Sequence, residues 1–138
     1  MDHNSIIDRE TFEVYEHAED YPKAFICDKR IAPSIALLNK KGYKTLASCS
    51  GHYRMEWATQ KIVMSYILFD KKYKFDSIPK DFTEEESDGR TLIFINVDLY
   101  KDDKLKKRPE FERELDNICQ NLNEWVNNIP YNKERNDD

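Results

Sequence analysis

Apolar residues recur at helical spacing in two parts of the chain. Between residues 109 and 129 they follow one another at intervals of four and three, a stripe of about five helical turns, at Phe111, Leu115, Ile118, Leu122, Trp125 and Ile129. A shorter stripe predicts a helix over about residues 29–41, with Pro33 in its first turn, Asp28 as its cap and Gly42 just beyond its end. Both stripes indicate helices packed on a core, and the longer one also permits a helix–helix dimer.

Strands are predicted where β-branched and aromatic residues cluster. Residues 61–69 and 90–97 are apolar on both faces, which is typical of central strands with both faces covered, or with one face covered and the other in an interface. Asn96 interrupts the second run; a buried amide needs partners, so it is either a structural bridge or a ligand contact. The alternation at residues 11–15 and the segment that starts at Tyr43 predict two more strands.

Polar stretches separate these elements. Residues 1–10, 79–87 and 101–107 are expected to be irregular, and Asp88-Gly89 is a turn signal. The elements together predict an α/β (α+β) fold, with a single domain over residues 1–130 and a polar tail over 131–138. We expect a mixed β-sheet of about four to five strands packed against two main helices (about 29–41 and 109–129).

Composition narrows the class of protein. The chain has 138 residues, 39 % of them hydrophobic, and a formal net charge of −5. An acidic chain without a long basic run lacks the electrostatic footprint of nucleic-acid binding. We see no apolar stretch of membrane-spanning length and no secretion signal. The wide spacing of Cys27, Cys49 and Cys119 favours free thiols in a reducing, cytoplasmic setting.

Small and reactive side chains gather in one segment, Ser48-Cys49-Ser50-Gly51-His52, directly after the strand that starts at Tyr43. Two hydroxyls, a thiol, a glycine and an imidazole fall together in a chain with only three Gly, three Cys and three His. Small side chains let a ligand approach the backbone, and successive amides can form an anion-binding concavity. The same residues also fit an ordinary strand end followed by a turn.

Three kinds of chemistry fit this segment. An anion would be held by the amides of Cys49 to Gly51, the hydroxyls of Ser48 and Ser50, and the side chains of His52 and Arg54. Alternatively, Cys49 is a nucleophile with His52 as its base, although no third, orienting residue is identified. Finally, Cys49-x-x-His52 is half of a zinc site, which Cys27 and His17 could complete only through folding. No metal site is predicted, and the cofactor is unknown.

The segment also resembles part of a known family. A Pro-containing helix, a Tyr/Thr strand and Ser-Cys-Ser-Gly are similar to the N-terminal part of the wybutosine-synthesis tRNA methyltransferase family, over roughly a fifth of the chain. The matching residues are Ile31, Pro33, Leu37, Leu38, Asn39, Tyr43, Thr45, Ser48, Cys49, Ser50 and Gly51. The resemblance implies a small α/β domain, S-adenosylmethionine as cofactor and an RNA base as methyl acceptor. His52 stands where the family has Arg.

The residues themselves favour a binding protein over an enzyme. We predict a small cytosolic protein that recognises an anionic, nucleotide-derived small molecule through the Ser48–Arg54 loop, for example a phage-type sponge for a nucleotide signal, and that forms a homo-oligomer. One alternative is an S-adenosylmethionine-dependent RNA methyltransferase-like enzyme with Cys49 and His52 in its site. A second alternative is a protein-interaction module in which the loop is only structural.

Overall fold

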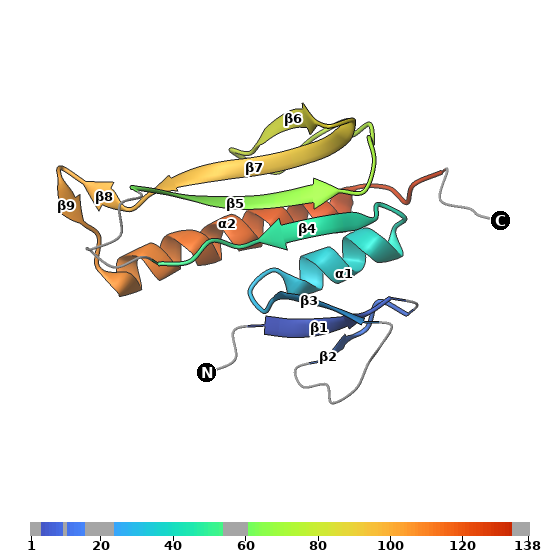
Figure 1. The fold of residues 1–138 in the computed structure, drawn as a ribbon, viewed down its shortest axis with the longest axis horizontal. Coiled ribbons are helices and arrows are strands. Elements are labelled where there is room, and N and C mark those ends of the chain that lie inside the picture. The colour runs from blue at the N-terminus through green and yellow to red at the C-terminus, as the bar shows by residue number, and fades with distance from the viewer. Residues whose placement is uncertain (1–3, 10, 16–23, 54–60, 134–138) are drawn as a thin grey trace.

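The computed structural model describes residues 4–9, 11–15, 24–53 and 61–133, and within these ranges the chain forms two helices and three sheets (Figure 1). The α+β fold class is therefore confirmed. The predicted single mixed sheet is replaced by three separate sheets, and every pair of described strands is antiparallel. Antiparallel pairing requires only that the chain reverse direction, whereas a parallel pair requires a crossover.

The largest sheet has the strand order β4-β5-β7-β6. Its strands are β4 (Thr45–Cys49), β5 (Ile62–Phe69), β6 (Thr83–Ser87) and β7 (Arg90–Asp98). The predicted strands over residues 61–69 and 90–97 are confirmed as the central pair. The turn predicted at Asp88-Gly89 joins β6 to β7, with φ of 52° and 75° at its two residues. Both values are positive, as a two-residue hairpin of this twist requires.

The second sheet has the order β2-β1-β3, and a short hairpin makes the third. The second sheet contains β1 (Asn4–Asp8), β2 (Val14–Tyr15) and β3 (Ala24–Asp28); the hairpin contains β8 (Tyr100–Lys101) and β9 (Lys104–Leu105). The prediction of irregular structure was therefore wrong for β1, β6 and the hairpin. These strands carry few apolar residues and are held by backbone pairing with β3, with β7 and with each other, which hydropathy does not reveal.

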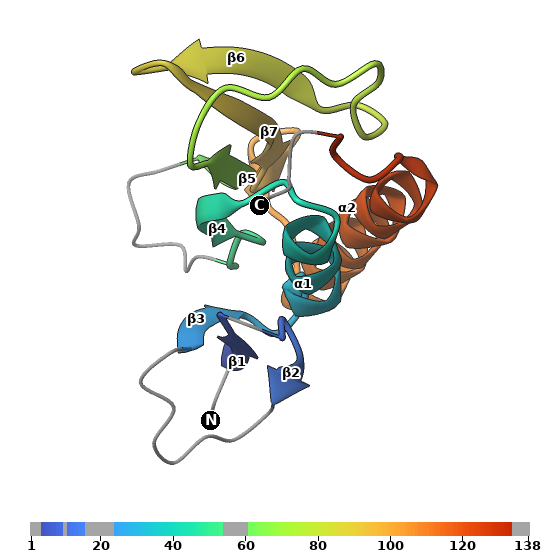
Figure 2. The same ribbon diagram turned by 90° about the vertical axis from the view of Figure 1, so that its right-hand side faces the viewer.

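Both predicted helices are confirmed, as α1 (Ala32–Lys40) and α2 (Arg108–Asn128), each with a proline in its first turn. They cover one face of the large sheet, and α1 lies between that sheet and the β2-β1-β3 sheet (Figure 2). Asp28 does not cap α1, which has no side-chain cap. Its carboxylate bonds to Ser50 instead, because β3 and β4 end side by side.

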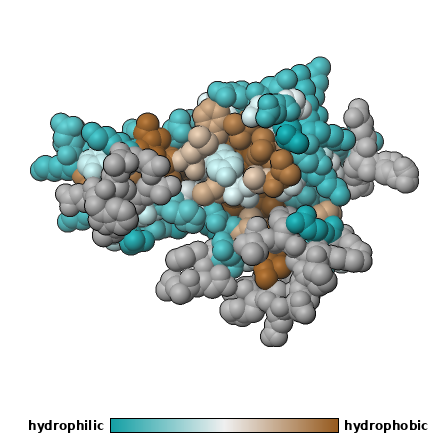
Figure 3. Space-filling view, viewed as in Figure 1, coloured by the Kyte–Doolittle hydropathy of each residue, from teal (hydrophilic) through white to brown (hydrophobic). Residues whose placement is uncertain are grey.

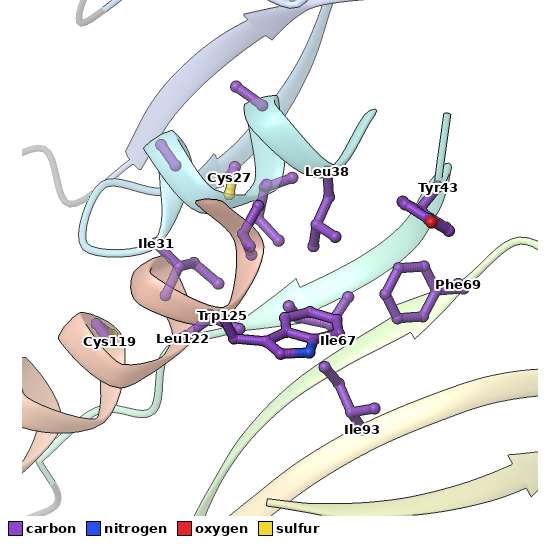
Figure 4. Packing of buried hydrophobic residues seen from close by; sticks show 14 of the residues in the cluster. Cys27, Ile31, Leu38, Tyr43, Ile67, Phe69, Ile93, Cys119, Leu122 and Trp125 are labelled. Atoms are coloured by element: carbon purple, nitrogen blue, oxygen red, sulfur yellow. The ribbon is translucent and has the colours of Figure 1, made fainter. Parts of the chain in front are cut away.

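The main core lies between the helices and the large sheet (Figure 4). Ile31, which directly precedes α1, Leu38 of α1, and Leu122 and Trp125 of α2 meet strand residues, among them Ile67, Phe69 and Ile93. The stripe of α2 is used in this core and in a second cluster around Phe111 and Leu115. Because those side chains are buried inside the domain, the stripe does not supply the helix–helix dimer contact.

The opposite face of the large sheet is exposed and partly apolar (Figure 3). Leu46, Ile62 and Met64 are 55 %, 51 % and 43 % exposed. The central strands were predicted to have either both faces covered, or one face covered and the other in an interface. In the described residues one face is covered by the helices and the other is open. Asn96 lies on the open side and is exposed, so the premise that it is buried was wrong. No helix of the described ranges is long and apolar enough to cross a membrane.

A side chain from outside α2 closes the C-terminal end of that helix. Lys41 is only 6 % exposed, and its Nζ donates to the carbonyl oxygens of Val126 (2.8 Å), Asn127 (3.2 Å) and Ile129 (2.6 Å). An ammonium group has three donors, and the last carbonyls of a helix lack intrahelical partners and carry partial negative charge. Lys41 thus fastens the end of α1 and the start of β4 to α2.

We expect Lys41→Met to lower the free energy of unfolding by about 2–3 kcal/mol, because the carbonyls stay buried while their charged donor is removed. Urea denaturation followed by circular dichroism measures this loss. Lys40→Met is the matched control: this exposed neighbour makes a surface ion pair with Glu13 and should cost less than about 1 kcal/mol. Equal losses in the two variants would contradict the proposed role of Lys41.

Candidate functional site

Polar side chains meet where β3 and β4 end side by side. Cys27 Sγ lies 3.8 Å from Ser48 Oγ. The carboxylate of Asp28 accepts hydrogen bonds from the amide of Ser50 (2.7 Å) and from its Oγ (3.2 Å). A carboxylate of the protein itself therefore uses donors that the sequence offered for an external anion.

Gly51 allows the backbone after β4 to pack closely against Val63 and Leu115. Its φ is +91°, and an added Cβ would lie 2.9 Å from Val63 Cγ1 and 3.3 Å from Leu115 Cδ2. Only glycine combines this backbone conformation with so close an approach. The sharp turn at Gly51 directs His52 back toward Asp28.

Three potential metal ligands converge at this turn. His52 Nε2 lies 3.4 Å from Asp28 Oδ2, and one ligand atom from each of Asp28, Cys49 and His52 lies within 4.8 Å of the other two. The Asp28 side chain is 14 % exposed and that of His52 is 52 % exposed, so the cluster is rooted in the domain and open on one side. The amide of Gly51 donates to Cys49 Sγ at 3.4 Å.

Strand alternation separates the two neighbouring residues Ser48 and Cys49. Ser48 pairs with the buried Ile67 and approaches Cys27, whereas Cys49 pairs with Tyr66, which is only partly buried. Burial raises the pKa of Tyr66, and the nearby charges of Cys49 and Asp28 raise it further. Tyr66 is thus the cross-strand neighbour of Cys49 in the large sheet.

The structure brings four of the predicted site residues together around Asp28, namely Cys49, Ser50, Gly51 and His52, whereas Ser48 faces Cys27 on the other side of β4. Arg54, Trp57 and His17 lie outside the described residues. Sequence reasoning missed Asp28, which it assigned to a helix cap, and Tyr66, which it treated only as part of a strand. No local pattern marked Asp28 as a site residue, because its partner Ser50 lies more than twenty positions away in the sequence.

The other two cysteines have a different environment from Cys49. Burial raises the pKa of Cys27 to about 12 and that of Cys119 to about 12. Both thiols are buried, and the raised pKa keeps them protonated at neutral pH in the protein alone. Cys49 is only partly buried.

Comparison of the chain with family models, with curated proteins and with solved structures found no match. The similarity to the wybutosine-synthesis tRNA methyltransferase family therefore stays a prediction.

Replacing Gly51 should destabilise the domain through two separable effects. Gly51→Ala places a Cβ in a positive-φ conformation and against Val63 and Leu115, and we expect a loss of about 3 kcal/mol. Gly89→Ala is the matched control: its φ is +75°, but nothing lies within 4 Å of the added Cβ, so only the conformational cost of about 1 kcal/mol remains. Thermal and urea denaturation measure both values, and equal losses would show that the close approach at Gly51 does not matter.

Thiol labelling should distinguish Cys49 from the other cysteines. In the native protein at pH 7.5, we expect iodoacetamide to modify Cys49 first, because burial keeps Cys27 and Cys119 protonated and inaccessible. Peptide mass spectrometry locates the label, and the unfolded protein should react at all three thiols. Native labelling of Cys27 before Cys49 would refute this assignment.

Proposed function

We propose that the protein binds a transition metal ion of the Zn²⁺ class through Asp28, Cys49 and His52, and that the bound ion recruits an anionic small molecule. The observation that carries the proposal is the convergence of a carboxylate, a thiol and an imidazole, with ligand atoms all within 4.8 Å of one another. Carboxylate, thiolate and imidazole are the ligand types that Zn²⁺ takes in proteins.

The separation between the His52 nitrogen and the Asp28 oxygen is close to that of a tetrahedral site. When nitrogen and oxygen each bind zinc at about 2.0–2.1 Å, the two atoms lie about 3.3 Å apart. His52 Nε2 and Asp28 Oδ2 are separated by 3.4 Å. Sulfur, at about 2.3 Å from the ion, would lie about 3.6 Å from either atom. In the structure the Cys49 sulfur lies within 4.8 Å of both.

The groups around these ligands support the same interpretation. Ser50 holds the Asp28 carboxylate with two hydrogen bonds, and the Gly51 amide points at the Cys49 sulfur. Outer hydrogen bonds of this kind orient ligands and stabilise their charged forms. Cys27 and Ser48, which approach each other on the inner side of β4, are not needed as ligands.

A nucleophile–base–acid triad fits less well. In a triad the thiol and the carboxylate bind opposite nitrogens of one imidazole, which separates sulfur from oxygen by about 7 Å. Here a ligand oxygen of Asp28 and the sulfur of Cys49 lie within 4.8 Å. The third residue that the sequence did not identify is thus present, but its position favours a shared ion over a proton relay.

The sequence predicted that the loop amides bind an anionic ligand, whereas under this proposal the metal ion binds it. The Ser50 amide bonds to Asp28 and the Gly51 amide to Cys49, so these two amides have internal acceptors. A metal with three protein ligands keeps a fourth position, which a phosphate or carboxylate oxygen of a small molecule can take. Methyl transfer from S-adenosylmethionine remains an alternative supported only by the family resemblance.

Cobalt titration tests the proposal directly. Adding Co²⁺ to the purified apo protein should give visible bands of tetrahedral intensity and a near-ultraviolet band from the Cys49 thiolate, and Zn²⁺ should displace both. Cys49→Ser should abolish the thiolate band, and His52→Ala and Asp28→Asn should each weaken affinity by at least about tenfold. Because binding requires a thiolate, affinity should rise with pH.

Cys119→Ser is the matched control, since it removes a thiol that lies outside the cluster. It should leave both the spectrum and the affinity unchanged. Absence of the thiolate band in the parent protein, or its survival in Cys49→Ser, would rule out the proposed site. Circular dichroism of each variant shows whether the fold persists.

A further inference from the structure

We propose a second ligand site at the opposite end of β4: a cavity that binds a phosphorylated small molecule of mononucleotide size. The cavity has a volume of about 430 Å³, within the range of about 300–1,000 Å³ of small-molecule sites. Its walls include Phe12, Lys40, Lys44, Lys71, Tyr73 and Asn132. None of these residues belongs to the Asp28–Cys49–His52 cluster.

The cavity is cationic in an acidic protein. Lys40, Lys44 and Lys71 line it together with a single carboxylate, that of Asp70, although the whole chain has a formal net charge of −5. Lys40 is paired with Glu13 at 3.2 Å. Among the ion pairs between described residues, none involves Lys44 or Lys71. Two ammonium groups without a carboxylate partner in the described part of the chain thus face one concave space.

Aromatic rings hold these two ammonium groups. Lys44 Nζ lies 5.4 Å from the ring centre of Phe12, and Lys71 Nζ lies 5.5 Å from that of Tyr73. A cation over a ring keeps its full charge and its donors for another partner, whereas a cation in a salt bridge is already neutralised. The rings also add apolar surface to the wall of the cavity.

The backbone beneath the cavity is already fixed. Tyr73 OH accepts from the Lys44 amide (3.1 Å) and donates to Asp70 Oδ1 (3.0 Å), so it ties the start of β4 to the turn after β5. Asn132 Nδ2 donates to the Gly42 carbonyl at 3.0 Å. A site of this kind needs little reorganisation when a ligand binds.

These features define the chemistry of the ligand. Two separated ammonium groups favour a dianion over a monocarboxylate, and lysine binds phosphate as a point charge. The rings and the volume favour an organic group larger than the phosphate itself. AMP is a suitable probe because it combines a dianionic phosphate with a flat base.

Calorimetric titration of the full chain with AMP, at low salt and constant ionic strength, tests the inference. We expect saturable binding that Lys44→Gln/Lys71→Gln weakens by at least about tenfold, because two charge-assisted contacts are removed. The control is Lys101→Gln/Lys104→Gln, which neutralises two exposed lysines of the β8–β9 hairpin and should leave the affinity unchanged. Absence of saturable binding, or equal affinity in the two double variants, would overturn the inference.

Two further titrations distinguish the cavity from a general phosphate site and from the proposed metal centre. Inorganic phosphate should bind more weakly than AMP, and equal affinities would overturn the role of the rings. AMP should bind equally well to EDTA-treated protein and to His52→Ala. Loss of AMP binding in those samples would show that AMP binds at the proposed metal centre and would overturn the cavity as its site. Failure of cobalt binding alone would contradict the metal centre but not the cavity.

Discussion

The burial of the Lys41 ammonium group at the end of α2 is the interaction on which the rest of the structure depends. A charged amine is costly to bury, and here the carbonyls of Val126, Asn127 and Ile129 accept its three protons. Tyr43 adds a hydrogen bond to the Pro130 carbonyl (2.8 Å), so the segment that leads into β4 is bound twice to the end of one helix. The start of β4 is thereby fixed relative to α2. The main core packs between α1, α2 and the large sheet in this arrangement.

The same helix fixes the other end of β4. Leu115, near the start of α2, lies against Gly51 just after the strand ends. Leu115 and Ile129 are about 20 Å apart along a helix, so α2 spans the distance between the two proposed sites. β3 and α1 complete the arrangement, because Asp28 can reach Ser50 only if β3 ends beside β4. The Asp28–Cys49–His52 cluster therefore depends on contacts between parts of the chain that are distant in sequence.

This dependence explains what the sequence could and could not predict. The stripe of α2, the strands β5 and β7 and the turn at Asp88-Gly89 are local patterns, and all were predicted. β1 and β6 form through backbone pairing with partners whose register no local pattern encodes. At the site, the residues of one segment were found because they are adjacent, whereas Asp28 was assigned to the nearest helix. Its real partners lie more than twenty positions away, across α1, and only the fold brings them together.

The position of Asp28 also decides which charge each end of β4 attracts. The Asp28 carboxylate accepts two hydrogen bonds from Ser50 and places negative charge beside His52 and Cys49. This charge would repel an added anion unless a metal ion were bound first. At the other end, Lys44 and Lys71 lie over aromatic rings and present positive charge to a cavity. The net charge of −5 for the whole chain does not reveal this local difference between the two ends of β4. Under the two proposals, the ends of β4 therefore bind ligands of opposite charge, a cation beside Cys49 and an anion beside Lys44 and Lys71.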